Sequence, residues 1–172
     1  MLKRSFLIGL SVTLLDSLLL SILLHMDVLG PFGEIQNRTY QIGGTILFLG
    51  IYLFLFFGIF YGLRQSRFKN GGRMTYKEAL ISGVSISFFT AFTSIITTII
   101  LYEIVYPDYA VLMGEKVRVA MTEKELDEKL INEKVTEIIE YHQTFVQAKF
   151  STIGNFITGL FYTLILGVFM KK

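Results

Sequence analysis

A single carboxylate interrupts the apolar run near the N-terminus, and it is the residue with the clearest chemical potential. Asp16 stands 11 residues after Ser5, which corresponds to about 16 Å along a helix and to the middle of a hydrocarbon layer about 30 Å thick. An acidic side chain at that depth costs about 2.5–3.5 kcal/mol on insertion scales, so it should face other helices. Asp16 could carry a proton or bind a cation, or it could be a protonated structural residue bonded to neighbouring hydroxyl groups.

Small and hydroxyl-bearing residues recur every three or four positions in the third apolar run, which puts them on one face of a helix. They are Ala79, Gly83, Ser87, Thr90, Ser94 and Thr97. With Asp16, the residues Ser87, Thr90 and Ser94 form a candidate intramembrane polar site. The face could line a hydrated pathway, or it could be a packing seam where small residues let helix backbones approach closely. Serine and threonine can donate to their own helix backbone, so their presence does not require water.

Five basic residues surround a Gly-Gly pair between the second and third apolar runs. They are Arg64, Arg67, Lys69, Arg73 and Lys77. The stretch lacks the Gly-Lys-Ser/Thr ending of a phosphate-binding loop, and no strand precedes it. Its charges are explained by the preference of lysine and arginine for the cytoplasmic side. The five residues are also candidates for contact with anionic lipid headgroups, at about 1 kcal/mol for each charge near the surface.

Motifs for catalysis or for cofactor and metal binding are missing from the sequence. There is no P-loop, no Gly-x-Gly-x-x-Gly after a strand and no His-Glu-x-x-His zinc motif. The chain has no cysteine and only two histidines, so thiolate chemistry is excluded and a metal site is not expected. Acidic residues between 108 and 149 alternate with lysines, which favours a solvated face over a calcium site. We therefore expect no catalytic residue, no cofactor, no metal and no nucleic-acid partner.

Four apolar runs must position these groups, and each is long enough to cross a bilayer as a helix. The predicted membrane domain covers the whole chain, 1–172, with helices at about 5–26, 41–63, 76–106 and 150–170. The first run is too long for a cleaved signal peptide, and no small-x-small cleavage site follows it. A capping box from Thr75 to Glu78 predicts that the third helix begins just after Thr75. The expected fold class is all-α integral membrane, with four transmembrane helices.

Lysine and arginine gather on one side of this arrangement, which predicts its orientation. The basic residues near both termini and those of the second loop all fall on that side, whereas the first loop has only Arg38. Both termini should therefore lie in the cytoplasm, and residues 108–149 should lie outside it.

The segment 108–149 is predicted to be an extracytoplasmic amphipathic helical insert. Tyr109 to Met121 should form a short helix, and a capping box beginning at Thr122 predicts a second helix over 123–148 that could continue directly into the fourth membrane helix. Its apolar stripe must be buried against the first insert helix, another subunit, a partner or the membrane surface. The candidate partner face consists of Leu130, Val135, Ile138 and Phe145.

Several stretches resemble the domain of unknown function 4199 family. They include FYGLRQSRFKNGGRMTYKEALISGVSISFF, IVYPDY, MTEKELDEKL and the terminal GLFYTLILGVFMKK. The resemblance covers nearly the whole chain and is strongest over 61–108. It implies a small multi-pass protein of the bacterial inner membrane with four helices. It implies no catalytic residue, because no established activity comes with the family.

Two functions fit these patterns. The first is a non-enzymatic inner-membrane protein that presents its outer insert to its own copy or to another membrane or periplasmic protein. The second is a small oligomeric transporter or channel that uses Asp16 and the Ser/Thr face of the third helix. The lipid bilayer is an expected partner in both cases.

Overall fold

The computed structural model describes residues 2–31 and 38–171, and four of its helical segments are long and apolar enough to cross a membrane. These spans lie in α1 (Leu2–His25), α2 (Arg38–Lys69), α3 (Tyr76–Ile99) with its π-helical continuation η1 (Ile100–Val105), and α6 (Thr144–Met170). Two shorter helices, α4 (Tyr109–Thr122) and α5 (Glu128–Tyr141), stand between the third and fourth spans. The prediction of an all-α, four-span protein with a helical insert at this place is confirmed.

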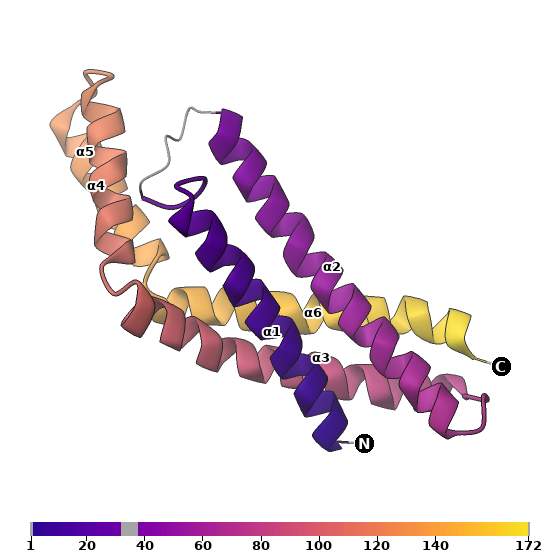
Figure 1. The fold of residues 1–172 in the computed structure, drawn as a ribbon. Helices are drawn as coiled ribbons and strands as arrows, with labels where there is room; N and C mark the ends of the chain where they lie inside the picture. The colour runs from indigo at the N-terminus through magenta and orange to yellow at the C-terminus, as the bar shows by residue number, and fades with distance from the viewer. Residues whose placement is uncertain (1, 32–37, 172) are drawn as a thin grey trace.

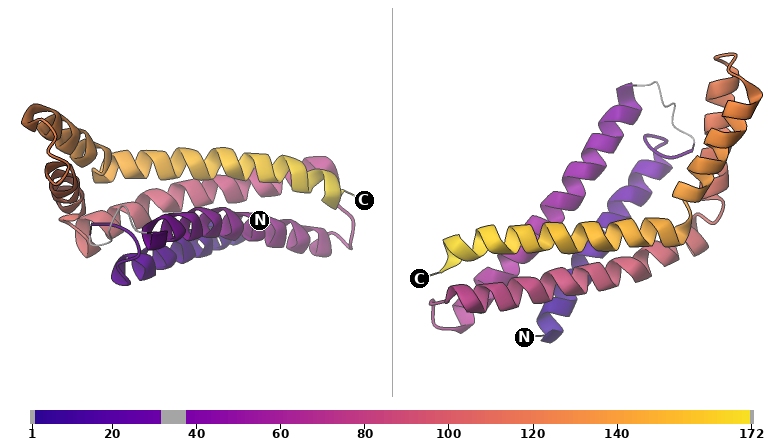
Figure 2. Two further views of the ribbon diagram at one scale, coloured as in Figure 1. Left: turned by 90° about the horizontal axis from the view of Figure 1, so that it is seen from above. Right: turned by 180° about the vertical axis from the view of Figure 1, so that it is seen from behind.

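The four spans form two pairs that cross each other. α1 lies beside α2, α3 lies beside α6, and α1 also packs along α3 (Figure 1). Both ends of the chain lie near the α2–α3 turn, whereas the α4–α5 hairpin stands at the opposite end of the bundle (Figures 1 and 2). Toward the hairpin end, α2 diverges from α6. The crossing therefore gives the bundle one closely packed end and one end where the pairs separate.

Small residues let α3 and α6 approach closely along their length. A Cβ atom added at Gly159 would lie 2.5 Å from the Ser87 Oγ and 2.7 Å from the Ser87 Cβ, and Thr163 packs directly against Gly83 in the same way. The Ser87 hydroxyl donates to the Gly83 carbonyl at 2.9 Å, which satisfies it inside its own helix. This part of the small-residue face is a packing seam, in agreement with one of the two interpretations of the sequence.

The core lies at the end of the bundle that carries the termini. The α2 side chains Leu55, Ile59 and Leu63 are fully buried and pack with Met74 and Ile86. α1 joins this core by a close approach at Gly9, where a Cβ atom would lie 2.7 Å from the Thr90 backbone nitrogen. Close van der Waals packing at this end holds the two crossing pairs together.

The basic connection between α2 and α3 is more helical than the sequence predicted. α2 continues to Lys69 instead of ending near Leu63, and the chain then turns through Gly71 and Gly72, whose φ angles are 70° and 85°. Such left-handed angles favour glycine because it has no Cβ. α3 begins just after Thr75, which is bonded reciprocally with Glu78, so the predicted capping box is confirmed.

The predicted single helix over 123–148 is wrong, although the short helix before it is confirmed. Thr122 is the last residue of α4 instead of a cap, and its hydroxyl donates back to the Arg118 carbonyl at 2.8 Å. The chain then turns, with a φ of 54° at Glu125, and α5 begins at Glu128. A second break at 142–143 separates α5 from α6, so the insert helix does not continue into the membrane.

Side-chain packing explains why the insert folds into a hairpin. Val135 and Ile139 of α5 lie against Gly114 of α4, where the absence of a side chain leaves room for them. Folding back therefore buries Ile131 and Val135 of the apolar stripe within the chain itself, while Leu130 stays exposed. Of the surfaces that could bury the stripe, the structure uses the first insert helix.

The seam between α3 and α6 can be tested by substitution. Gly159→Val should destabilise the protein by about 1–3 kcal/mol, because the added methyl groups must displace Ser87 and overpack the contact. Gly154→Val on the same helix is the matched control, since a Cβ atom there would meet no packing partner within 4 Å. Thermal unfolding in detergent would measure the difference, and equal stability of both variants would contradict the role of the seam.

Candidate functional site

A cavity of about 410 Å³ lies between the four spanning helices in the half of the bundle that carries the hairpin. Its deep end is lined by Thr13 of α1, Tyr52 of α2, Ser94 of α3 and Asn155 of α6. From there it extends to Tyr109 at the base of the hairpin. It occupies the region where the two helix pairs separate, so the crossing of the pairs creates the site.

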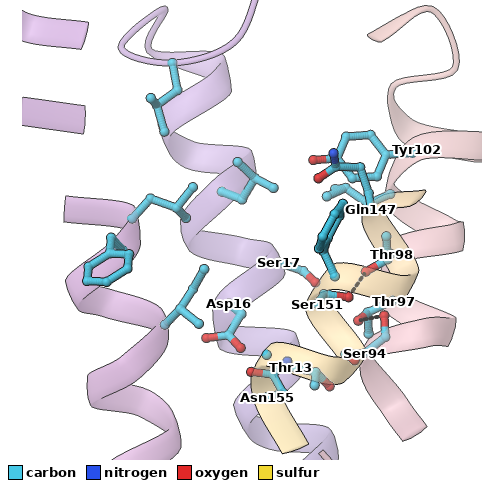
Figure 3. A pocket seen from close by; sticks show the side chains of 18 of the residues that line it. Thr13, Asp16, Ser17, Ser94, Thr97, Thr98, Tyr102, Gln147, Ser151 and Asn155 are labelled. Carbon is cyan, nitrogen blue, oxygen red and sulfur yellow. Dashed lines mark hydrogen bonds between the residues drawn. The ribbon is translucent and has the colours of Figure 1, made fainter. Parts of the chain in front are cut away.

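Asp16 lies at the deep end of this cavity. Its side chain points into the space near Thr13, Ser17 and Asn155 (Figure 3). The Oδ1 atom is buried, and no donor among the described residues forms a hydrogen bond with it. A buried polar atom without a partner is rare in folded proteins. Asp16 therefore keeps unused bonding capacity inside a space large enough for a ligand.

Three hydroxyl groups that line the cavity with Asp16 form hydrogen bonds elsewhere. The Ser94 hydroxyl donates to the Ala91 carbonyl at 2.8 Å, and the Thr97 hydroxyl donates to the Thr93 carbonyl at 3.2 Å. Ser151 likewise donates to the Ala148 carbonyl at 3.1 Å, and its Oγ lies 3.3 Å from the Thr98 hydroxyl (Figure 3). These oxygens line the cavity with their protons already committed, so they are left mainly as acceptors.

Aromatic side chains dominate the rest of the lining. They are Tyr40, Phe48, Tyr52, Tyr102, Tyr109 and Phe150. At the hairpin end, the Tyr109 ring lies 5.0 Å from the Tyr102 ring and 5.6 Å from the His142 ring, measured between centroids. Burial raises the pKa of Tyr109 above its usual range, with Tyr102 and Tyr40 adding to the effect, so its phenol stays neutral. The upper cavity is therefore a neutral, ring-lined space.

Lys116 connects the hairpin to the first two helices. Its ammonium group donates to the Gly30 carbonyl at 2.5 Å and lies 4.2 Å from the centroid of the Tyr40 ring. Desolvation lowers the pKa of Lys116 from its ordinary value. A cation over the face of a tyrosine is attracted by the ring quadrupole. This contact fixes the middle of α4 against the turn after α1 and the start of α2, beside the cavity.

The structure divides the candidate intramembrane polar site. Asp16 and Ser94 line the cavity, whereas Ser87 and Thr90 are fully buried at helix contacts outside it. The other polar residues of the cavity had no chemical role in the sequence-based prediction. These are Thr13, Ser17, Thr98, Tyr102, Gln147, Ser151 and Asn155. The regular spacing of Ser151 and Asn155 along the last apolar run was the signal that could have found two of them.

The other two candidate surfaces lie away from the cavity. Arg64, Lys69, Arg73 and Lys77 are exposed near the α2–α3 turn, and Arg67 is partly buried there because its Nε donates to the Gly72 carbonyl at 2.9 Å. Their position at the end of the spans is compatible with the predicted contact with lipid headgroups.

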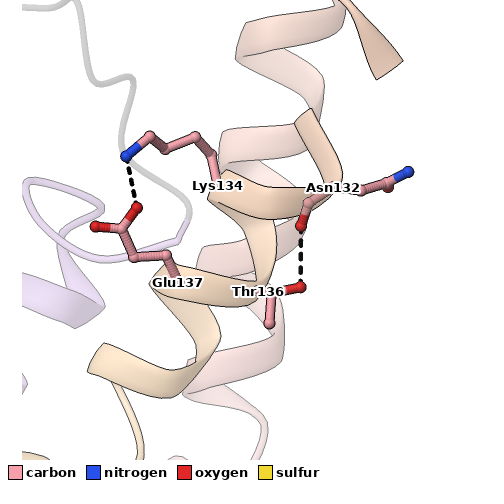
Figure 4. A network of polar contacts seen from close by, with 4 residues as sticks. All are labelled: Asn132, Lys134, Thr136 and Glu137. Atoms are coloured by element: carbon pink, nitrogen blue, oxygen red, sulfur yellow. Dashed lines mark hydrogen bonds and ion pairs between the residues drawn. The ribbon is translucent and has the colours of Figure 1, made fainter. Parts of the chain in front are cut away.

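The candidate partner face of the insert is not one continuous surface. Val135 is only 7% exposed because it packs inside the hairpin, so it cannot belong to an exposed face. Ile138 is partly buried, whereas Leu130 and Phe145 are exposed, Phe145 to 78%. The outer side of α5 is polar: Lys134 pairs with Glu137 at 2.5 Å, and the Thr136 hydroxyl donates to the Asn132 carbonyl at 2.9 Å (Figure 4).

The described parts of the chain contain no cluster of side chains that could hold a metal ion. Within residues 2–31 and 38–171, no three His, Cys, Asp or Glu side chains come close enough to hold a metal ion together. The chemistry available in the cavity is that of one carboxyl group, hydroxyl and amide side chains, one imidazole and a set of aromatic rings.

Comparison with known proteins places the chain in a family. No curated protein and no solved structure shows significant similarity to it. The model of the DUF4199 family, described as proteins of unknown function, matches residues 11–172. Because this match covers nearly the whole chain, including Asp16 and all of α6, the chain belongs to the DUF4199 family.

Proposed function

We propose that this four-span membrane protein is a non-enzymatic binding protein, whose cavity admits a small ligand to Asp16 from the outer side of a bacterial inner membrane. The observation that carries the proposal is Asp16 itself: its side chain lines a cavity of about 410 Å³, and its buried Oδ1 lacks a hydrogen-bond partner among the described residues. Small-molecule sites are typically cavities of about 300–1,000 Å³, mostly apolar with a few placed polar groups. The cavity fits that description.

If Asp16 had only a structural role, no hydrogen bond among the described residues would offset the free-energy cost of burying its unpaired Oδ1. A buried polar group without a partner costs about 1–3 kcal/mol, and more when it is charged. Ser94 and Thr97 are near enough to line the same cavity, yet both direct their protons to main-chain carbonyls. The bonding capacity of Asp16 is thus left for a molecule that enters the cavity.

The packing of the opposite end favours a binding site over an open channel. Leu55, Ile59 and Leu63 are 0% exposed and fill the bundle below the cavity. The cavity lining ends at Thr13 and Asn155, so its length is confined to the hairpin half of the bundle. A transporter or channel would require this core to open, and the arrangement supports access from one side.

Cysteine labelling tests access to the cavity, because the native chain contains no cysteine. Ser17→Cys should react with a membrane-impermeant methanethiosulfonate reagent added to the outer side of spheroplasts, since Ser17 lines the cavity beside Asp16. The mass shift of the purified protein measures the reaction. Thr90→Cys is the matched control and should stay unlabelled, because Thr90 is fully buried where α1 meets α3. Unlabelled Ser17→Cys beside labelled Thr122→Cys would contradict the proposal.

The proposed orientation has both termini in the cytoplasm and the hairpin outside. It is supported by the gathering of lysine and arginine at the end of the bundle that carries the termini. With the same impermeant reagent, Thr122→Cys should be labelled in intact spheroplasts, and Lys69→Cys only after the membrane is permeabilised. The reverse pattern would place the termini outside.

A second candidate function, presentation of the hairpin to a partner, is favoured by apolar side chains that remain exposed on it. Val111, Val119 and Leu130 lie outside the spans and are each more than two-fifths exposed. Exposed apolar patches often mark interaction surfaces. The partner would be a second copy of this chain or another membrane or periplasmic protein.

A charge at one of these positions tests the second function. Val119→Asp should reduce oligomers or co-purified complexes severalfold, because it places a carboxylate in an apolar contact, while four-span insertion is unchanged. Light scattering of the detergent-solubilised protein and native mass spectrometry measure the complexes. Lys124→Asp, at the exposed hairpin turn, is the control. If both variants assemble like the native protein, the hairpin face is not the interface.

A further inference from the structure

We propose that the ligand of this cavity carries an ammonium group, which the Asp16 carboxylate binds while the surrounding aromatic rings receive its organic substituents. The inference rests on the proposed function, since it names the chemical class that would occupy the same cavity. Four features of the lining support it: the unpaired carboxyl group of Asp16, the hydrogen-bonding state of three hydroxyls, the rings and the size of the space.

Asp16 has no lysine or arginine partner in the cavity, because no such residue among those described lines it. The nearest basic group at the rim, Lys116, is held by the Gly30 carbonyl and the Tyr40 ring. His142 lies at the hairpin end of the lining, where its Nδ1 is 2.8 Å from the Ile138 carbonyl. A carboxylate in such surroundings is stabilised most by an incoming cation.

The hydroxyl groups select for a ligand that donates hydrogen bonds. Ser94, Thr97 and Ser151 have committed their protons to carbonyls of their own helices, so their free lone pairs face the cavity. An anion would meet these lone pairs and the Asp16 carboxylate, which repel it. An ammonium group or its polarised CH groups would be attracted by the same lone pairs and by Asp16.

The rings and the volume distinguish an organic cation from a metal ion. A bare sodium or calcium ion is coordinated by six or more close oxygens, whereas this space of about 410 Å³ is walled mainly by aromatic and aliphatic side chains. Aromatic faces bind ammonium ligands through cation–π attraction. Lys116 already uses the Tyr40 ring in this manner within the protein itself.

An ammonium group could reach Asp16 from two sources. One is a free small amine from the outer aqueous phase, and the other is the headgroup of an amine-bearing lipid such as phosphatidylethanolamine, entering between the diverging helices α2 and α6. Both supply the same chemistry to the same carboxylate, so the experiment includes an arm for each.

The selectivity of the cavity for cations can be measured by comparing the rates at which a cationic and an anionic reagent label a cysteine inside it. In Ser17→Cys protein placed in phosphatidylglycerol nanodiscs, the ratio of the labelling rate of a trimethylammonium methanethiosulfonate to that of a sulfonate reagent of similar size should exceed the same ratio for a free thiol about tenfold. Adding Asp16→Asn should bring the ratio of the two rates close to that of a free thiol. Glu103→Gln removes the same charge near the same end of the bundle but outside this cavity, and it should leave the ratio unchanged.

Protection of Ser17→Cys from labelling shows whether the ammonium group comes from a free amine or from a lipid headgroup. Tetramethylammonium should slow labelling of Ser17→Cys severalfold, whereas an equal concentration of sodium should not. If the lipid headgroup is the source, labelling should instead be slow in nanodiscs containing phosphatidylethanolamine without added amine. Protection by either source supports the inference; equal protection by sodium, or none from any of the three, overturns it.

The outcomes separate this inference from the proposed function. If neither reagent labels Ser17→Cys while both label Thr122→Cys, the cavity is closed and the proposed function fails. If both reagents label Ser17→Cys at rates that do not depend on Asp16, the cavity exists but does not select ammonium ligands.

Discussion

The close approach of α3 and α6 is the constraint on which the other features depend. Small residues at Gly83 and Gly159 bring the two backbones together, and the hydroxyls opposite them are satisfied within their own helices. α1 and α2 cross this closely packed pair at an angle. The separation of the pairs toward the hairpin, and with it the cavity around Asp16, follows from this arrangement.

Much of the architecture could be predicted because its signals are local or depend on the bilayer alone. Length and apolar character identify the four spans, and the Thr75–Glu78 capping box identifies the start of α3 from residues that bond to each other. The depth of Asp16 follows from helical rise. The packing role of Gly159 and Thr163 follows from their four-residue spacing, since that spacing defines a helix face.

The features that escaped prediction depend on contacts between distant segments. The pattern after Thr122 has the residues of a capping box, but α4 and α5 gain more by packing Val135 and Ile139 against Gly114, so the chain turns there. The cavity combines Ser17 of α1 with Thr98 of α3 and Ser151 of α6, and no spacing within one helix reveals that meeting. The division of the polar face between cavity and seam likewise depends on where α1 crosses α3.

The crossing of the helix pairs also gives the lipid environment a mechanical role. Two pairs that cross cannot both stand along the membrane normal, and α2, with 32 residues, is about 48 Å long against hydrocarbon about 30 Å thick. Tilt is the means by which long helices adapt to bilayer thickness. The tilt of α2 relative to α6 thus both adapts the long helix to the bilayer and leaves the space above Asp16 between the diverging helices.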